Sequence, residues 1–123
     1  MNKKYKIAIV DDEPEILNML SRFLQRENRY EVVSFSNPIN AISSIDNSYD
    51  VVMLDIMMPQ MSGLEALEKI IEKNPDQKVI MMTAYSTLDK VLKSHKEGAT
   101  HYLMKPFSSL EHIEKKLIEV LKN

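Results

Sequence analysis

The sequence predicts an α/β domain with a doubly wound, five-stranded parallel sheet flanked by five helices. Short apolar runs alternate along the chain with amphipathic stretches of roughly ten to fifteen residues, the pattern of repeated strand–helix units. The central runs are apolar without interruption, as in strands that helices cover on both faces. Polar residues directly follow the runs, at the edge of the sheet where ligands bind in folds of this class.

Five apolar runs are predicted strands. Three are continuously apolar and predict central strands, whereas the other two alternate with polar residues or are short, and predict edge strands. The predicted central strands are residues 7–10, 51–54 and 79–82, and the predicted edge strands are residues 31–35 and 102–104. The strand order 2-1-3-4-5 is common in this architecture and opens a crevice between the first and third strands.

Each predicted helix carries an apolar face and a start or stop signal. Ser62 and Ser108 each precede a glutamate by three residues, which is the pattern of a capping box. Asn37 predicts an N-cap before a helix that begins with proline. The fourth helix is expected to begin at Ser86 and to end at Gly98. The residues expected to face inward are Ile16, Leu20, Phe23 and Leu24; Ile39, Ile42 and Ile45; Leu64, Leu67, Ile70 and Ile71; Leu88, Val91, Leu92 and His95; and Ile113, Leu117, Val120 and Leu121.

Composition limits the classes of function. The 123 residues are expected to form one domain, residues 1–123, because this length suits a single core. A formal net charge of −2 provides no basic surface for nucleic acid, and the lack of cysteine excludes disulfides and thiolate metal sites. No apolar run approaches the about 18 residues of a membrane span, so we expect no membrane association and a cytoplasmic location.

Chemically active side chains follow four of the predicted strands. Asp11 and Asp12, Asp55, Thr83 and Lys105 each stand one or two residues beyond an apolar run. Because parallel strands end at the same edge of a sheet, these side chains are expected to converge. Three carboxylates repel one another unless positive charge lies among them. Lys105 offers one such charge, and oxygen ligands favour Mg²⁺ or Mn²⁺ over Zn²⁺ as a further one.

These residues lie within an ordered set of motifs that resembles the receiver domain of bacterial two-component response regulators. The similarity covers essentially the whole chain, which also resembles the single-domain members of chemotaxis and sporulation. The motifs are Val10-Asp11-Asp12-Glu13-Pro14, Asp55-Ile56-Met57-Met58-Pro59 with Ser62-Gly63, Met82-Thr83-Ala84-Tyr85, and Gly98-Ala99 through Tyr102-Leu103-Met104-Lys105-Pro106-Phe107.

The resemblance implies a phosphoryl-accepting switch rather than an enzyme. Asp55 would accept the phosphoryl group from a sensor histidine kinase or a histidine phosphotransfer protein. Asp12 and Asp55 would bind Mg²⁺ directly, with Asp11 acting largely through water and the backbone carbonyl of Met57 completing the protein ligands; Mn²⁺ is an alternative metal.

The resemblance also implies a set of residues around the phosphoryl group. Lys105 would pair with Asp55 and then with the phosphoryl oxygens, and Thr83 would hydrogen-bond the phosphoryl group. Backbone N–H groups of Met57 and Ala84 would supply further donors, and Tyr102 would rotate inward as Thr83 moves. The Lys105–Pro106 peptide bond is expected to be cis.

Two interaction surfaces follow from the same resemblance. The output surface would combine residues 86–98, the last strand and residues 108–122, and would signal to a downstream protein or a fused effector domain. The candidates for contact with the kinase are Pro14, Glu15, Asn18, Met19, Phe107 and Ser108. The chain is expected to be a monomer, with a weak dimer as an alternative after phosphorylation, and to bind no nucleic acid directly.

Three alternative interpretations share part of this pattern. An aspartate-nucleophile phosphatase usually carries a second acid two residues after its nucleophile, where this chain has Met57. A flavodoxin-like FMN binder needs a hydroxyl- and glycine-rich loop after the first strand, where residues 11–14 are acidic and proline. The third alternative keeps the fold but makes the chain a receiver cut from a transcription factor or hybrid kinase, and the sequence leaves this open.

Overall fold

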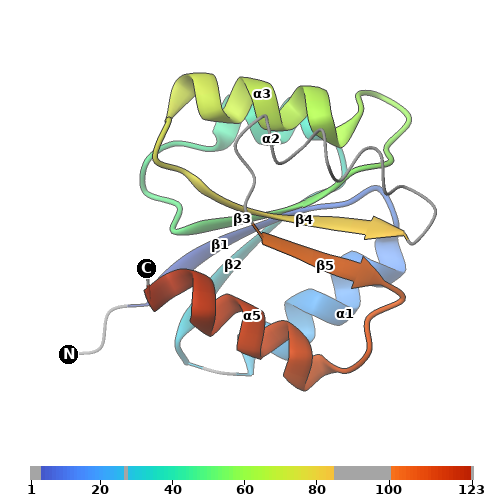
Figure 1. The fold of residues 1–123 in the computed structure, drawn as a ribbon, viewed down its shortest axis with the longest axis vertical. Helices are drawn as coiled ribbons and strands as arrows, with labels where there is room; N and C mark the ends of the chain where they lie inside the picture. The colour runs from blue at the N-terminus through green and yellow to red at the C-terminus, as the bar shows by residue number, and fades with distance from the viewer. Residues whose placement is uncertain (1–3, 27, 85–100, 123) are drawn as a thin grey trace.

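The computed structural model describes residues 4–26, 28–84 and 101–122, and its strands form one parallel sheet (Figure 1). The strand order is β2-β1-β3-β4-β5, which confirms the predicted order and places β2 and β5 at the edges. The strands are β1 (Tyr5–Val10), β2 (Tyr30–Phe35), β3 (Val51–Asp55), β4 (Lys78–Ala84) and β5 (His101–Lys105). Each includes its predicted run and extends beyond it by one or more residues.

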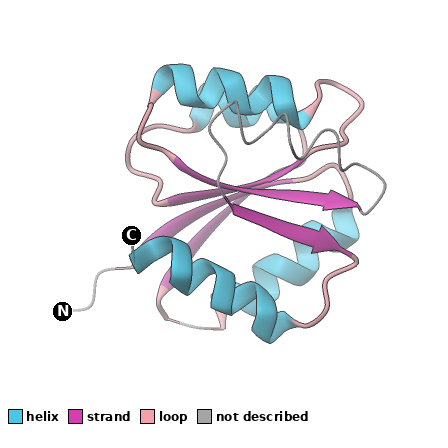
Figure 2. Cartoon of the chain, in the orientation of Figure 1, coloured by secondary structure: helices cyan, strands magenta, loops and turns pink. Residues whose placement is uncertain are grey.

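The described helices cover both faces of the sheet (Figure 2). They are α1 (Pro14–Gln25), α2 (Pro38–Ser44), α3 (Gly63–Lys73) and α5 (Leu110–Lys122). Helices α2 and α3 lie over one face, and α1 and α5 lie over the other. The helix predicted over residues 86–98 lies outside the described residues. Among the helices that are described, none combines the length and apolar character needed to cross a membrane.

The core consists of two layers because successive residues of a strand point to opposite faces. Ala8, Val10 and Leu54 pack with α2 and α3, whereas Ile9 and Met53 pack with α1 and α5. All five side chains are inaccessible to solvent. Burial on both faces explains why the central strands read as continuous apolar runs in the sequence.

Two of the predicted helix starts are confirmed and one is wrong. The Ile39 N–H donates to Asn37 Oδ1 at 2.8 Å, and the Glu65 N–H donates to Ser62 Oγ at 3.2 Å. The cap of α5 is Ser109 rather than Ser108, because the helix begins one residue later than predicted and the His112 N–H donates to Ser109 Oγ at 3.0 Å. Ser109 is also a favoured capping residue, although no glutamate stands three residues after it.

The predicted inward face of α2 is also partly wrong. Ile39 is 52% exposed, whereas Pro38 and Ala41 are buried. Pro38, Ala41 and Ile45 follow a helical spacing of three and four residues, so the face that packs on the sheet is rotated by about one position from the prediction. Ile45 ends the helix and is buried as predicted.

Gly63 lets the start of α3 approach the end of β3. Its N–H donates to the Ile56 carbonyl at 2.7 Å. A Cβ atom at this position would lie 2.1 Å from the Asp55 carbonyl oxygen and 2.6 Å from the Ile56 Cα. Both are backbone atoms that cannot rotate away, so only glycine fits here without a shift of the chain that carries Asp55.

We expect Gly63→Ala to destabilise the fold by at least about 2 kcal/mol, since overpacking against backbone forces neighbouring segments apart. The free energy of unfolding from urea titration measures this effect. Glu68→Ala, at an exposed position of the same helix, is the control and is expected to change stability by less than about 0.5 kcal/mol. Equal stability of the two variants would contradict the steric argument.

Candidate functional site

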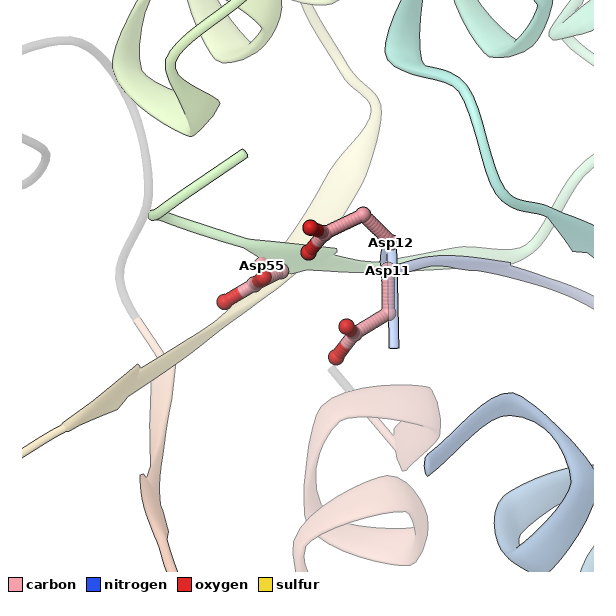
Figure 3. A group of neighbouring side chains, drawn as sticks. All are labelled: Asp11, Asp12 and Asp55. Atoms are coloured by element: carbon pink, nitrogen blue, oxygen red, sulfur yellow. The ribbon is translucent and has the colours of Figure 1, made fainter. Parts of the chain in front are cut away.

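Three carboxylates lie together where two neighbouring strands end. Asp11 and Asp12 follow β1, and Asp55 is the last residue of β3, which pairs directly with β1 (Figure 3). Each contributes a carboxylate oxygen to a group in which all three oxygens lie within 4.8 Å of one another. Asp11 is fully buried and Asp55 is 4% exposed. The parallel register therefore brings together the aspartates that the sequence placed at strand ends.

The Lys105 ammonium lies among these carboxylates although its strand, β5, is at the edge of the sheet. Its Nζ atom is 2.6 Å from Asp11 Oδ2, 3.0 Å from Glu13 Oε1 and 3.3 Å from Asp55 Oδ1. The lysine side chain is long enough to reach across the end of β4 to the acidic group. The ammonium thus offsets part of the negative charge that the strand ends concentrate here.

Glu13 is the member of this group that the sequence analysis did not assign to the site. It is the residue before α1, and its side chain accepts no helix-capping hydrogen bond. Its carboxylate contacts Lys105, while its backbone N–H donates to Asp11 Oδ1 at 2.9 Å. The signal for it was present in the sequence: a third acid directly after Asp11 and Asp12, and directly before a proline that starts a helix.

The electrostatics of the group reflect burial with incomplete neutralisation. Burial, together with the nearby Asp11 charge, raises the pKa of Asp55 to about 7, against the opposing effects of Lys105 and a hydrogen bond from the Met57 backbone. Burial also raises the pKa of Asp11. For Lys105, burial disfavours the charged form, but the hydrogen bond to Asp11 and the Asp55 charge outweigh it and the pKa is raised.

The residues at this site fit a divalent cation. The described donors are carboxylate oxygens, which hard cations such as Mg²⁺ prefer. The three carboxylates of this group, with Glu13 as a fourth, face a single ammonium, that of Lys105, so acidic groups outnumber basic ones. A divalent cation would supply the missing positive charge.

The other predicted site residues occupy β4, β5 and the loop after β3. Thr83 is fully buried near the end of β4, and Ala84 is the last residue of that strand, in register with Lys105. Tyr102 is half-buried and packs against the core layer under α2 and α3. Met57 is 53% exposed. Tyr85 lies outside the described residues, and the expected cis peptide between Lys105 and Pro106 is confirmed.

The candidate docking residues lie beside the acidic group on α1 and on the segment between β5 and α5. Pro14, Glu15, Asn18 and Ser108 are exposed, whereas Met19 and Phe107 are half-buried against the core. A groove of about 490 Å³ is lined by Glu15, Asn18, Met19, Arg22, Phe23, Arg26 and Leu110. Leu110 was not predicted to line this groove, because it begins α5 whereas the other lining residues belong to α1.

The raised pKa of Asp55 implies that the free energy of unfolding depends on pH. In the unfolded chain this group titrates near pH 3.8, so between about pH 4 and pH 7 the folded protein binds more protons than the unfolded chain. The ionised Asp55 therefore lowers the free energy of unfolding as the pH rises through this range. At pH 8, with a chelator present to remove divalent cations, we expect Asp55→Asn to be more stable than the native chain by roughly 1–3 kcal/mol.

The gain should shrink as the pH falls towards 4, because the Asp55 carboxyl of the folded chain is then protonated and uncharged. Urea titrations at pH 4.5 and pH 8 measure it. Asp76→Asn, at an exposed position, is the control and should change stability by less than about 0.5 kcal/mol at either pH. A native chain that is equally or more stable than Asp55→Asn at pH 8 would contradict the electrostatic argument.

Comparisons with known proteins agree with this geometry. The family model for the response regulator receiver domain matches residues 7–118. The chemotaxis protein CheY of Listeria monocytogenes is 37% identical over 114 residues, which are 89% of this chain and 96% of that protein. The structure described as the BeF3-activated DrrB receiver domain is 33% identical, with a TM-score of 0.86 and coverage of 98% of this chain and 99% of that one.

Other relatives are longer. The transcriptional regulatory protein FlgR of Helicobacter pylori is 38% identical over 102 residues, which are 83% of this chain but only 26% of that protein. The match over 112 residues to the family model, with the acidic group and lysine in place, shows the family of this chain. The chain belongs to the response regulator receiver domains, the phosphoryl-accepting modules of two-component signalling, which carry an acidic divalent-metal site and are not catalytic enzymes in the usual sense.

Proposed function

We propose that Asp55 accepts a phosphoryl group from a phosphohistidine of a sensor histidine kinase or histidine phosphotransfer protein. An Asp55 carboxylate oxygen forms a bond to phosphorus as the bond from phosphorus to the imidazole nitrogen breaks, and that nitrogen keeps the electron pair. The observation that carries the proposal is the position of Asp55 between two other carboxylates and the Lys105 ammonium, at the end of a central strand. A carboxylate nucleophile of this kind has general precedent.

Asp11, Asp12 and Asp55, with the Met57 backbone carbonyl, are proposed to hold the metal, which we take to be Mg²⁺ with Mn²⁺ as an alternative. When bound, the cation would offset negative charge on the carboxylates and on phosphoryl oxygens. Oxygen donors from two adjacent strand ends, all within 4.8 Å of one another, support this set of side-chain ligands.

Lys105 is proposed to bind phosphoryl oxygens through its ammonium, which already lies 3.3 Å from Asp55. The Thr83 hydroxyl and the backbone N–H groups of Met57 and Ala84 are proposed as further donors to the same oxygens. Phosphoryl transfer requires mainly such positioning and charge neutralisation. Burial of Asp55 and Thr83 supports these roles because it strengthens electrostatic contacts by excluding water.

Thr83 and Tyr102 are proposed as the switch that passes the change to an output surface of residues 86–98, β5 and α5. Tyr102 is half-buried and in register with Met81, two residues before Thr83 along β4, so a change at the strand end has a short path to it. A downstream protein or a fused effector domain would recognise this surface. Residues 86–98 themselves lie outside the described residues.

The phosphodonor is proposed to dock on Pro14, Glu15, Asn18, Met19, Phe107 and Ser108. The groove beside the acidic group supports this surface, because Met19, Phe23 and Leu110 give it an apolar floor and Arg22 and Arg26 give it a charged side. Such a mixture suits a partner helix that combines apolar and acidic residues. A monomer, a cytoplasmic location and the extent of the domain over residues 1–123 remain predictions.

The proposal predicts a labile phosphoryl adduct on Asp55. After incubation with Mg²⁺ and acetyl phosphate, intact-mass measurement is expected to show one added phosphoryl group. The adduct should be absent with a chelator and in Asp55→Asn. Asp50→Asn, at a half-buried aspartate outside the acidic group, is the matched control and should still be phosphorylated. An adduct that persists in Asp55→Asn would place the acceptor elsewhere, and no adduct with any donor would indicate a receiver that signals by binding alone.

A second prediction concerns Met57 and the lifetime of the phosphoryl group on Asp55. Its side chain is exposed two residues beyond Asp55 and offers no oxygen or N–H group to orient an attacking water. We therefore expect Met57→Asn to shorten the lifetime several-fold, since the asparagine amide can hydrogen-bond and orient the attacking water. The loss of adduct mass with time measures this, and Met57→Leu, which stays apolar, is expected to match the native chain. Equal lifetimes of the asparagine and leucine variants would contradict the idea.

A further inference from the structure

Asp11, Glu13 and Lys105 form a closed ring of hydrogen bonds at the edge of the site. The Lys105 ammonium donates to Asp11 Oδ2 at 2.6 Å and to Glu13 Oε1 at 3.0 Å. The ring closes because the Glu13 backbone N–H donates to the other oxygen of Asp11 at 2.9 Å. Glu13 is therefore attached to the acidic group through both its backbone and its side chain, and its contacts position the ammonium.

Glu13 departs from the usual behaviour of the residue before a helix. Side chains at this position commonly accept a hydrogen bond from an N–H group in the first helical turn. The Glu13 side chain makes no such bond to α1 and reaches Lys105 instead. Glutamate is not among the residues that commonly cap helices, so the Glu13 side chain serves the site rather than the start of the helix.

The three carboxylates around Lys105 differ in how firmly they hold it. The Asp11 side chain is fully buried and the Asp55 side chain is 6% exposed, whereas the Glu13 side chain is 59% exposed. Exposed ion pairs are weaker because water competes for both charges. An ammonium has three N–H donors, and two already serve Asp11 and Glu13. Glu13 is the partner that Lys105 can leave most easily.

We propose that Glu13 is a positioning residue that holds the Lys105 ammonium beside Asp11 before phosphorylation and releases it to the phosphoryl group on Asp55. The inference rests on the proposed function of Asp55 and Lys105. Glu13 acts through Lys105 and makes no contact with the phosphoryl group. Lys105 must break its ion pair with Glu13 before its ammonium can turn fully towards the reacting oxygens. Glu13 therefore slows phosphoryl transfer.

The test measures the rate of phosphorylation by acetyl phosphate in Mg²⁺ over a range of donor concentrations. In Glu13→Gln we expect the maximal rate to rise about threefold to fivefold, the range expected for loss of an exposed ion pair. The half-saturating concentration of acetyl phosphate distinguishes this effect from repulsion between the Glu13 carboxylate and the anionic donor. Loss of repulsion lowers that concentration, whereas release of Lys105 raises the maximal rate.

Two further variants make the test specific. Glu13→Asp keeps the negative charge but is one methylene shorter, so it cannot hold the ammonium as Glu13 does; we expect it to raise the maximal rate as Glu13→Gln does. Glu65→Gln removes a charge from the same end of the sheet, at an exposed residue in the first turn of α3 that forms no ion pair with Lys105 among the described residues. We expect it to alter the half-saturating concentration alone.

The outcomes separate this inference from the proposed function. If the native chain is not phosphorylated, the proposed function fails first. If it is phosphorylated and Glu13→Gln leaves the maximal rate unchanged or lowers it, the positioning role is overturned. A maximal rate that rises in Glu13→Gln and not in Glu13→Asp would also overturn it, since charge rather than contact with Lys105 would then be responsible.

Discussion

The interaction on which this structure depends is the attraction between one partly buried ammonium, that of Lys105, and the carboxylates that surround it. Parallel strands deliver Asp11 and Asp55 to the same edge of the sheet, where helices on both faces exclude water. At an effective dielectric of 20, two such charges about 5 Å apart repel by roughly 3 kcal/mol. Lys105 reduces this repulsion from the far side of β4 but cannot remove it, so the site keeps an excess of negative charge.

The surrounding fold holds these charges in place by backbone contacts rather than by side chains alone. Gly63 brings the start of α3 against the Asp55 carbonyl, and the Ile56 N–H donates to the Met82 carbonyl of β4. Backbone contacts with α3 and β4 therefore fix the chain around Asp55 independently of the contacts of its side chain. Such rigidity is what a site needs when catalysis and binding depend on position rather than on reactive groups.

The sequence was sufficient to predict which elements would meet at the site, but not the finer contacts. Strand order and the convergence of Asp11, Asp55 and Lys105 follow from apolar runs and parallel pairing, and both were confirmed geometrically. The cap of α5 was displaced by one residue, because Ser109 caps the helix without the glutamate that completes the capping-box pattern at Ser108. Glu13 was missed because a pattern cannot show which way a long side chain turns when its local role and a distant partner compete.

The same excess of charge connects the stability of the fold with its function. A buried carboxylate with a pKa near 7 costs folding energy whenever it is ionised, so natural selection for stability alone would remove it. A divalent cation held by these carboxylates would offset that cost in the folded state only. By linkage, whatever binds the folded state in this way also stabilises it. The unfavourable charge of the ionised Asp55 would therefore couple cation binding at this site to the stability of the domain.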